Sequence, residues 1–347
     1  MQEMRKITFG IIGTGRIGRL HAEHLAVHIP EARVLAVADV NLDAAKKAAC
    51  EYEIPLAVQD YRELLDQKDI DAVVIASATH THSQIIRDAA CAGKQIFCEK
   101  PIDLDLSRVL QVLKVIEENG VTFQVGFNRR FDPSFQKAKE LIQAGKIGEP
   151  HLIRITSRDP APPPLDYLKA SGGIFLDMTI HDFDMTRFLL DREATEIMAM
   201  GCVRINPEIK KIGDIDTCLI NMHLQNDILA SIDNSRRAVY GYDQRVEIFG
   251  SDGMISVANA KPDTHVYINQ EGEHTARPHY FFVERYKEAY VAELKSFIDC
   301  LLHHHAPPVN GRDGLMALVM GMAAQKSFKE HRPVALNEIY PAAEFER

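Results

Sequence analysis

The sequence has few cysteines and no long hydrophobic run. Its 6 cysteines are scattered, without a Cys-x-x-Cys pair or the Cys/His spacing of a zinc site. This usage is typical of buried thiols in a reducing compartment, so we expect a cytoplasmic protein without a structural or catalytic metal. The longest apolar stretches, such as DAVVIASA, are far shorter than the roughly 20 residues that span a bilayer. Near the N-terminus, glycines and Arg16 interrupt the apolar run, which argues against a signal peptide.

An excess of positive charge is also missing. The chain has 40 basic and 49 acidic residues and a net charge of −9. This balance argues against binding to nucleic acid or to anionic lipid and favours small-molecule partners. At 347 residues with 46% hydrophobic side chains, the chain is long enough for two domains with a substantial core.

The first part of the chain alternates apolar strands with amphipathic helices. Such alternation predicts a parallel sheet covered on both faces, a doubly wound fold of the Rossmann type, over residues 1–127. The expected strands cover residues 6–12, 32–39, 72–77, 94–99 and 121–127. The expected helices cover residues 16–29, 42–52, 83–93 and 105–119.

From residue 128 the pattern changes to strands joined by turn-sized links. We expect an α+β domain over residues 128–347, with a largely antiparallel open sheet that binds substrate and mediates oligomerisation. The expected strands cover residues 151–158, 196–205, 215–224, 227–235, 244–250, 253–259 and 265–270. Helices are expected over residues 133–148, 171–190, 285–302 and 312–331.

A glycine-rich turn follows the first strand. Gly13, Gly15 and Gly18 have the spacing G-x-G-x-x-G, and the second strand ends in Asp39. This context predicts dinucleotide binding, with the pyrophosphate at the helix N-terminus formed by Arg16 and Ile17. A carboxylate at residue 39 favours NAD, because it binds a ribose diol and repels a 2′-phosphate. NADP use through a rearranged loop stays open.

The segment SGGIFLDMTIHDFDMTRFLL, residues 171–190, predicts one helix with charges on an unusual face. At 100° per residue, Asp177, His181 and Asp184 share a stripe with apolar side chains. The expected water-exposed face carries instead Thr179, Asp182 and Thr186. An ordinary ion pair would also explain an Asp and a His four residues apart.

Lys100 follows the strand at residues 94–99 in the tripeptide Glu-Lys-Pro. At the carboxyl end of a parallel strand, such a side chain faces a cofactor crevice. A positioned Lys or His can take the proton of a hydroxyl as hydride leaves its carbon. A solvated surface lysine is the alternative interpretation.

Together, the glycine-rich turn, Glu-Lys-Pro and GG followed by D-x-x-x-H resemble the Gfo/Idh/MocA oxidoreductase family over the whole chain. The resemblance implies NAD-dependent oxidation of a ring hydroxyl of myo-inositol to its 2-keto form, by a homotetramer. It also implies that Lys100, Asp177 and His181 bind the substrate and catalyse its oxidation. Either Lys100 or His181 would take the proton, with Asp177 orienting the imidazole.

Further candidates rest on their positions in the chain. Expected cofactor contacts are Ser77, Thr79, His82 and Glu99, and expected substrate contacts are Arg130, Asp159 and Tyr240. Asp184 is a further substrate candidate. The alternatives are helix capping for His82, loop capping for Asp159, and a place on the sheet surface for Tyr240.

Other functions remain open. The same machinery would suit scyllo-inositol or a cyclic aldose, and related folds include glycosidases that retain NAD and regulators that bind it without turnover. Apolar residues in the strands CLINMHL and ILASI predict that one face of the second sheet is covered by another copy of the chain.

Overall fold

The structure is a computed structural model that describes residues 5–341. It forms two compact units, which we describe separately. The first unit contains residues 5–128 and 288–316, and the second contains residues 129–287 and 317–341. The expected division between residues 127 and 128 lies one residue from the observed one. The return of residues 288–316 to the first unit was not part of that expectation.

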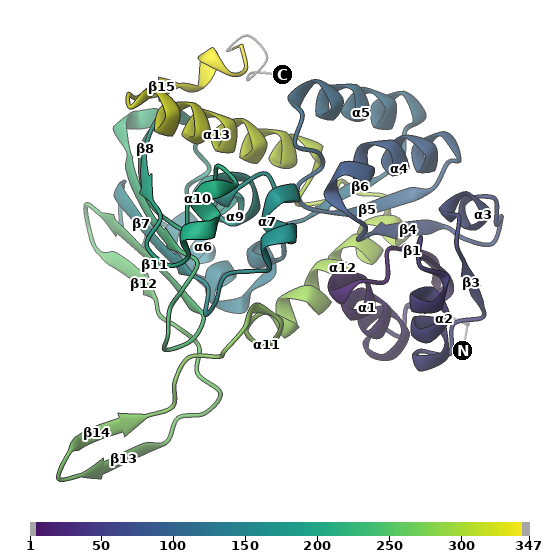
Figure 1. The fold of residues 1–347 in the computed structure, drawn as a ribbon, viewed down its shortest axis with the longest axis horizontal. Coiled ribbons are helices and arrows are strands. Elements are labelled where there is room, and N and C mark those ends of the chain that lie inside the picture. The colour runs from purple at the N-terminus through teal and green to yellow at the C-terminus, as the bar shows by residue number, and fades with distance from the viewer. Residues whose placement is uncertain (1–4, 342–347) are drawn as a thin grey trace. The chain divides into compact units, whose positions relative to one another are not determined.

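The first unit contains a six-stranded parallel sheet, which confirms the predicted doubly wound fold (Figure 1). The strand order is β3-β2-β1-β4-β5-β6. Successive strands are added on one side of β1 as far as β3 and then, from β4, on its other side. The strands are β1 (Ile7–Ile12), β2 (Ala32–Ala38), β3 (Leu56–Val58), β4 (Ala72–Ile75), β5 (Gln95–Glu99) and β6 (Phe123–Gly126). Only β3 was not predicted, because it has three residues and lacks a sustained apolar run.

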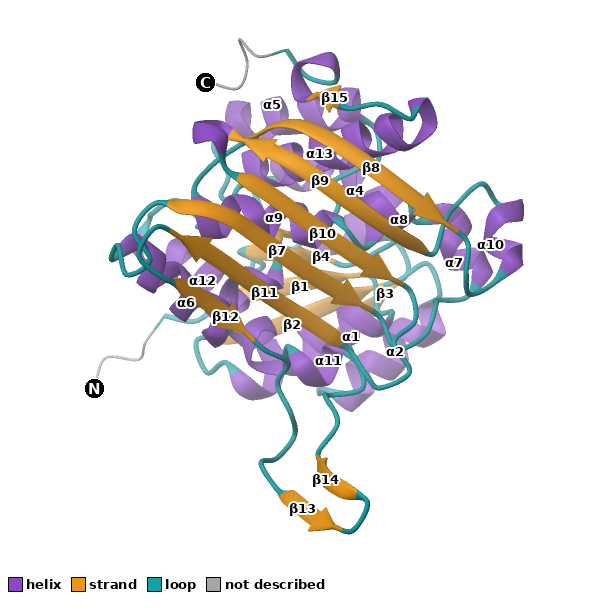
Figure 2. Ribbon diagram, turned by 90° about the vertical axis from the view of Figure 1, so that its left-hand side faces the viewer, coloured by secondary structure: helices purple, strands orange, loops and turns teal. Residues whose placement is uncertain are grey.

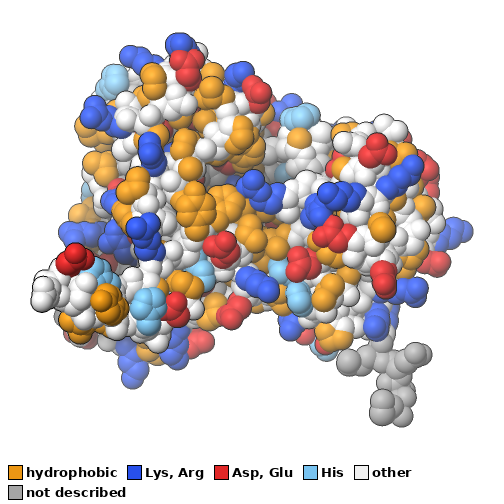
Figure 3. All heavy atoms as spheres, turned by 60° about the horizontal axis from the view of Figure 1, so that its bottom comes forward, with side chains coloured by type: hydrophobic (Ala, Val, Ile, Leu, Met, Phe, Trp, Pro, Cys, Tyr) orange, Lys and Arg blue, Asp and Glu red, His pale blue; other side chains and the backbone are white. Residues whose placement is uncertain are grey.

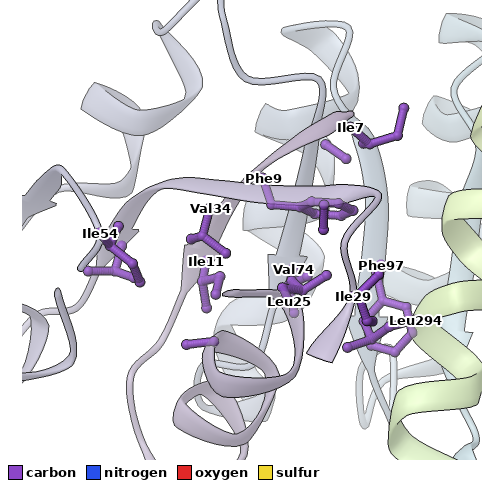
Figure 4. Packing of buried hydrophobic residues seen from close by; sticks show 14 of the residues in the cluster. Ile7, Phe9, Ile11, Leu25, Ile29, Val34, Ile54, Val74, Phe97 and Leu294 are labelled. Carbon is purple, nitrogen blue, oxygen red and sulfur yellow. The ribbon is translucent and has the colours of Figure 1, made fainter. Parts of the chain in front are cut away.

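The helices of the first unit follow the predicted pattern except for α3, which was not predicted. They are α1 (Arg16–Glu23), η1 (His24–His28), α2 (Leu42–Glu51), α3 (Tyr61–Leu65), α4 (Thr79–Cys91) and α5 (Leu106–Asn119). Asn41 and Asp105 cap α2 and α5 by accepting backbone N–H groups. The later helix α12 (Lys287–His303) places Leu294 and Phe297 in the same core as Phe9 (Figure 4). Burial of these side chains explains why the chain returns to this unit.

The second unit contains a seven-stranded sheet in the order β12-β11-β7-β10-β9-β8-β15. All its pairs are antiparallel except β7 with β10, so the prediction of a largely antiparallel sheet is confirmed. The strands are β7 (Pro150–Arg158), β8 (Ala194–Cys202), β9 (Thr217–Leu224), β10 (Leu229–Ser235), β11 (Asp243–Gly250), β12 (Met254–Val257) and β15 (Val334–Ala335).

One face of this sheet carries the helices of the unit, whereas the other face carries none in the view of Figure 2. The longer helices are α6 (Pro133–Gln143), α9 (Ile180–Leu190) and α13 (Gly311–Glu330), of which α13 starts in the first unit. Shorter ones are η2 (Asn128–Phe131), α7 (Leu165–Ala170), α8 (Ile174–Asp177), α10 (Pro207–Lys211), η3 (Gln225–Asp227), α11 (Phe282–Arg285) and η4 (Leu336–Glu338).

A separate hairpin of β13 (Val266–Asn269) and β14 (Gly272–Thr275) extends away from the seven-stranded sheet (Figure 1). All residues of both strands are exposed. Acidic and basic side chains are interspersed with hydrophobic ones over the surface drawn in Figure 3. Within residues 5–341, no helix has the length and apolar character needed to cross a membrane.

Candidate active site

The glycine-rich turn has the geometry that its spacing predicted. Gly13 adopts φ +94°, and Gly18 packs so closely that an added Cβ would lie 1.8 Å from the carbonyl oxygen of Gly13. Gly15 precedes α1 and has open space where a Cβ would be. The backbone conformation at Gly13 and the close packing at Gly18 therefore require glycine. At Gly15 the absence of a side chain leaves the N-terminus of α1 accessible. These residues fit a dinucleotide phosphate, which the N–H groups of a helix N-terminus bind.

Asp39 lies directly after β2, beside this turn. Its Oδ2 accepts hydrogen bonds from the backbone N–H of Thr14 at 2.7 Å and from Thr14 Oγ1 at 3.0 Å. Its Oδ1 accepts the N–H of Asn41 at 2.9 Å. These bonds fix the carboxylate at the carboxyl end of β2, where an acid that binds a ribose diol is expected.

His82 connects two loops at the carboxyl ends of β4 and β5. Its Nδ1 lies 2.9 Å from the carbonyl oxygen of Pro101, and its Nε2 lies 3.1 Å from that of Ser77. Burial lowers the pKa of His82, although both carbonyl contacts oppose this shift. The ring is 1% exposed, so it is not a surface helix cap. Thr79 is half-buried as the first residue of α4.

Glu99 and Lys100 follow each other at the end of β5. Glu99 Oε1 lies 2.7 Å from Nε2 of the buried His21, a residue of α1. Lys100 is half-buried and precedes a cis peptide bond to Pro101. Glu99 is therefore bound to a histidine of the protein itself. Lys100 lies at the carboxyl ends of the parallel strands, where the glycine-rich turn also lies.

The predicted helix over residues 171–190 is wrong in extent. Gly172 and Gly173 adopt φ +85° and +81°, which are incompatible with a helix start at residue 171. The remaining residues form α8 and α9, separated by Met178 and Thr179. Asp177 is the last residue of α8, and the half-buried His181 is the second residue of α9.

Asp177 is held by two partners within the second unit. Tyr167 Oη donates to its Oδ1 at 2.7 Å, and Arg236 Nη1 donates to its Oδ2 at 3.1 Å. Arg236 is fully buried. Burial and the neighbouring Asp177 charge raise the pKa of Tyr167, so its hydroxyl keeps its proton and acts as a donor. These two hydrogen bonds fix the orientation of the Asp177 carboxylate.

Asp159 belongs to the same charged cluster. It follows β7, and its backbone N–H donates to the carbonyl of Ser235 at 2.9 Å. Burial raises the pKa of its carboxyl to about 6, while Arg236 lowers it and Asp177 raises it further. Carboxyl groups whose pKa is raised in this way are frequent in functional sites.

The expected water-exposed face of the helix is also wrong. Thr179, Asp182 and Thr186 are all buried, because a polar network covers them. Arg129 Nη1 donates to Asp182 Oδ1 at 2.7 Å, and Asn234 Nδ2 donates to Asp182 Oδ2 at 2.8 Å. A helical wheel could not reveal these partners, since they lie on distant parts of the chain.

Two expected substrate contacts have partners within the protein. Arg130 makes a bidentate pair with the buried Asp184, at 2.9 and 2.6 Å. Tyr240 Oη donates to Asp243 Oδ2 at 2.6 Å and accepts from Arg158 Nη1 at 3.2 Å. These contacts give Arg130 and Asp184 a structural role in holding α9.

Our reading of the sequence missed Tyr167 and Arg236. Tyr167 lies in the proline-rich segment SRDPAPPPLDY, and Arg236 lies four residues before Tyr240. The predicted residues Asp159 and Tyr240 lie close to them in the sequence, but neither Tyr167 nor Arg236 shows a spacing that links it to Asp177. Arg236 is separated from Asp177 by 59 positions, so only the fold brings them together.

Comparison with known families agrees with this geometry. Residues 7–127 match the oxidoreductase family with an NAD-binding Rossmann fold, and residues 135–256 match the GFO/IDH/MocA C-terminal domain. The first match covers the sheet with the glycine-rich turn. The second covers the elements that carry Asp159, Asp177, His181 and Arg236.

Two relatives and two solved structures are similar over almost their full length. The myo-inositol 2-dehydrogenase of Thermotoga maritima is 47% identical, over 95% of this chain and 98% of the relative. The inositol 2-dehydrogenase of Rhizobium meliloti is 44% identical, over 95% and 99%.

Among solved structures, a probable dehydrogenase from Thermotoga maritima has a TM-score of 0.94 at 46% identity, covering 96% of this chain and 100% of that one. The scyllo-inositol dehydrogenase of Lactobacillus casei, solved with NAD(H) and scyllo-inositol, has a TM-score of 0.91 at 34% identity, with coverage of 96% and 99%. Since two family domains match and these relatives span the chain, the protein belongs to the Gfo/Idh/MocA family of NAD-binding oxidoreductases.

Proposed function

We propose that this protein is an NAD-dependent dehydrogenase that oxidises one ring hydroxyl of myo-inositol to 2-keto-myo-inositol. The observation that carries the proposal is the Asp177 carboxylate, fixed by Tyr167 and Arg236 four residues before His181. This arrangement occurs in a chain that also has a dinucleotide-binding turn. The inositol dehydrogenases at 44–47% identity support inositol as the substrate class.

The proposed catalytic residues are Lys100, Asp177 and His181. His181 or Lys100 takes the hydroxyl proton, and the charge of Lys100 stabilises the developing alkoxide. Asp177 orients the imidazole of His181 and stabilises its cation. Bound NAD would supply the acceptor for the hydride. The proposed contacts of the cofactor are Gly13, Gly15, Arg16, Ile17, Gly18 and Asp39. Further proposed contacts of the cofactor are Ser77, Thr79, His82 and Glu99.

Recognition of a polyol requires polar groups that match its hydroxyls, because unmatched polar groups in a buried site are costly. We propose Asp159 as the main such group beside the catalytic residues. A contribution from Arg130 or Tyr240 would require each side chain to share its present partner with the substrate.

A second candidate substrate is scyllo-inositol, and a cyclic aldose is a third. The similarity to a dehydrogenase solved with scyllo-inositol favours the first of these alternatives. A glycosidase or a regulator that retains NAD would release no NADH on any polyol, which distinguishes both from a dehydrogenase.

We further propose a homotetramer in the cytoplasm. The open face of the second sheet exposes Met200, Leu219, Phe249 and Met254, and β-strand pairing places Met200 opposite Leu219 and Phe249 opposite Met254. Such an apolar face supports contact with another copy. All 6 cysteines are free, as expected in a reducing compartment.

The catalytic assignment is tested with the variants Lys100→Ala and His181→Ala. We expect each to lower kcat by about 10²- to 10⁴-fold, because each removes a group that handles the proton or its charge. The Kd for NAD, measured by calorimetry, should stay within about twofold of wild type. The exposed Lys114→Ala is the matched control and should retain full activity. Turnover at the wild-type rate in either site variant would show that the proposed site is wrong.

A further inference from the structure

Three ionisable side chains meet inside the first unit, apart from the groups assigned to catalysis. His21 comes from α1, Glu99 from β5 and Glu293 from α12, and one side-chain atom of each lies within 4.8 Å of the others. His21 and Glu293 are fully buried, and the Glu99 side chain is 13% exposed. We refer to these three residues as the His-Glu-Glu cluster. It joins the helix after the dinucleotide turn to the strand that ends beside Lys100.

Hydrogen bonding in the cluster is incomplete. His21 Nε2 lies 2.7 Å from Glu99 Oε1, while neither carboxyl oxygen of Glu293 has a hydrogen-bond partner among the described residues. His21 Nδ1 also has none within that part of the chain. A neutral ring with its proton on Nε2 leaves only a lone pair at Nδ1, whereas an imidazolium would bury a charge and an unpaired N–H.

The charge state of Glu293 follows from its surroundings. An ionised carboxylate without partners is too costly to bury, and a second carboxylate lies close by. Burial and the charge of Glu99 therefore raise the pKa of Glu293 well above its usual range. Two carboxylates this close repel each other, and Glu293, which has no hydrogen-bond partner among the described residues, is the one whose protonated form is favoured.

The neighbours of the cluster leave Glu99 little room to move. A Cβ at Gly126 of β6 would lie 3.2 Å from the Glu99 carboxyl group. Gln124, also on β6, donates to the backbone carbonyl of Glu293 at 3.0 Å. The ring of Tyr290 on α12 lies 5.9 Å from that of His21. On α4, the charge of Glu99 acts to raise the pKa of His82. Within residues 5–341, no lysine or arginine pairs with Glu293 to offset a second negative charge.

We propose that Glu293 is a positioning residue that carries a proton of its own, so that the His-Glu-Glu cluster holds one negative charge and keeps Lys100 in place. A second charge would push Glu99 away from His21 and shift the peptide that carries Lys100. The link to turnover rests on the proposed role of Lys100, whereas the protonation of Glu293 does not.

The protonation itself is tested by infrared spectroscopy on the full-length protein. We expect wild type at neutral pH to show the carbonyl band of a protonated carboxyl that is missing from Glu293→Gln. The same band should persist in Lys100→Ala. An identical carboxyl region in wild type and Glu293→Gln would overturn the proposal. So would one equivalent of a bound divalent metal in wild type that Glu293→Gln loses, since a metal requires ionised carboxylates.

Kinetics tests the positioning role. Glu293→Leu should lower kcat by up to about 100-fold, as expected for a slightly misplaced catalytic group, because its branched side chain does not fit the space of the carboxyl beside Glu99. Glu293→Gln should retain most of the wild-type kcat, because its amide is neutral and has the shape of the protonated carboxyl. In wild type, kcat/KM should fall at alkaline pH as Glu293 ionises, and Glu293→Gln should lack that fall. Equal losses in both variants, or identical pH profiles in wild type and Glu293→Gln, would contradict the role. If wild type oxidises no polyol while the infrared band is present, only the proposed function fails.

Discussion

At the residue scale, the second unit contains several aspartate and arginine side chains that lie close together away from water. Asp159, Asp177 and Asp182 lie close enough to influence one another, and Arg129 and Arg236 compensate them. Each arginine donates to an aspartate through a buried guanidinium, so the carboxylates keep fixed directions. The chemistry of the site therefore depends on side chains beyond those that would touch the substrate.

Asp159 should give the protein a measurable pH dependence. Because its pKa in the folded protein is raised from 3.8 to about 6, the protonated form is favoured by folding. Its stabilising contribution is complete below pH 3.8 and is lost as pH rises through about 6. The difference between the Tm of Asp159→Asn and that of wild type should therefore shift in favour of the variant as the pH rises from about 4 to about 6, as measured by calorimetry. A constant difference between the two Tm values would contradict the raised pKa.

The same substitution should weaken substrate binding. At pH 7 most Asp159 side chains are ionised and accept hydrogen bonds from hydroxyls more strongly than an amide does. We expect Asp159→Asn to raise KM for the polyol by about 10- to 100-fold with little change in the Kd for NAD. An unchanged KM would remove Asp159 from the substrate contacts.

The Arg130–Asp184 pair should act through stability. Arg130→Met leaves a buried carboxylate without its bidentate partner, which costs about 3–5 kcal/mol of unfolding free energy. The double variant Arg130→Met/Asp184→Leu should recover most of that loss in urea unfolding, because the carboxylate is removed together with its partner. A rise in KM without loss of stability would instead assign Arg130 to the substrate.

Single residues show how far the sequence could predict the site. The spacing of Asp177 and His181 and the position of Lys100 after an apolar strand are local features, and they indicated these residues without a structure. The partners of Asp177 could not be predicted, because Arg236 follows β10, 59 positions further along the chain, and only the fold brings the two side chains together. For the same reason, the face occupied by Asp182 was assigned to water although a buried arginine covers it.

At the element scale, the glycines of the turn between β1 and α1 have different roles: Gly13 and Gly18 are needed for the structure, and Gly15 for the cofactor. Gly18→Ala places a methyl group against the carbonyl of Gly13, so we expect loss of stability and of NAD binding together. Gly15→Ala meets no atom of the protein within 4 Å and should leave Tm unchanged. It should nevertheless weaken NAD binding, because a side chain there obstructs the phosphates. Tm and Kd measured on both variants check the distinction; wild-type affinity in Gly15→Ala would contradict it.

Strands and helices were predictable where their signal is long. The apolar runs of β1, β2, β4, β5 and β6 indicated a parallel sheet, and alternation in β9 indicated one buried face. The short strands β3, β14 and β15 have two to four residues and too little pattern to be recognised. The helix over residues 171–190 failed because its two glycines adopt positive φ, a conformation that periodicity does not reveal.

At the scale of the whole molecule, the open face of the seven-stranded sheet should hold copies of the chain together. Phe249 is 49% exposed on this face, opposite Met254. Phe249→Glu introduces a charge into the apolar surface, so we expect a lower molar mass in light scattering and an unchanged circular dichroism spectrum. Val27→Glu, on an exposed residue of η1, is the matched control and should keep the wild-type mass. An unchanged mass in Phe249→Glu would place the contact between copies elsewhere.

The return of the chain to the first unit is also a property of the whole molecule. Leu294, Phe297 and Ile298 of α12 complete a core that begins with Ile7 and Phe9. The amphipathic pattern predicted this helix, but it could not show which unit the helix joins. That choice depends on the apolar surface which the first unit leaves for α12 to cover.

The most direct test of the proposed function is NADH formation by the purified protein across inositol stereoisomers and aldoses, with NAD and NADP in parallel. The account predicts NADH with myo-inositol at the highest kcat/KM, formation of the 2-keto product, and weak or no reduction of NADP because Asp39 repels a 2′-phosphate. Absence of NADH with every polyol, with nicotinamide retained through purification, would contradict a dehydrogenase. A higher kcat/KM for another substrate would contradict myo-inositol.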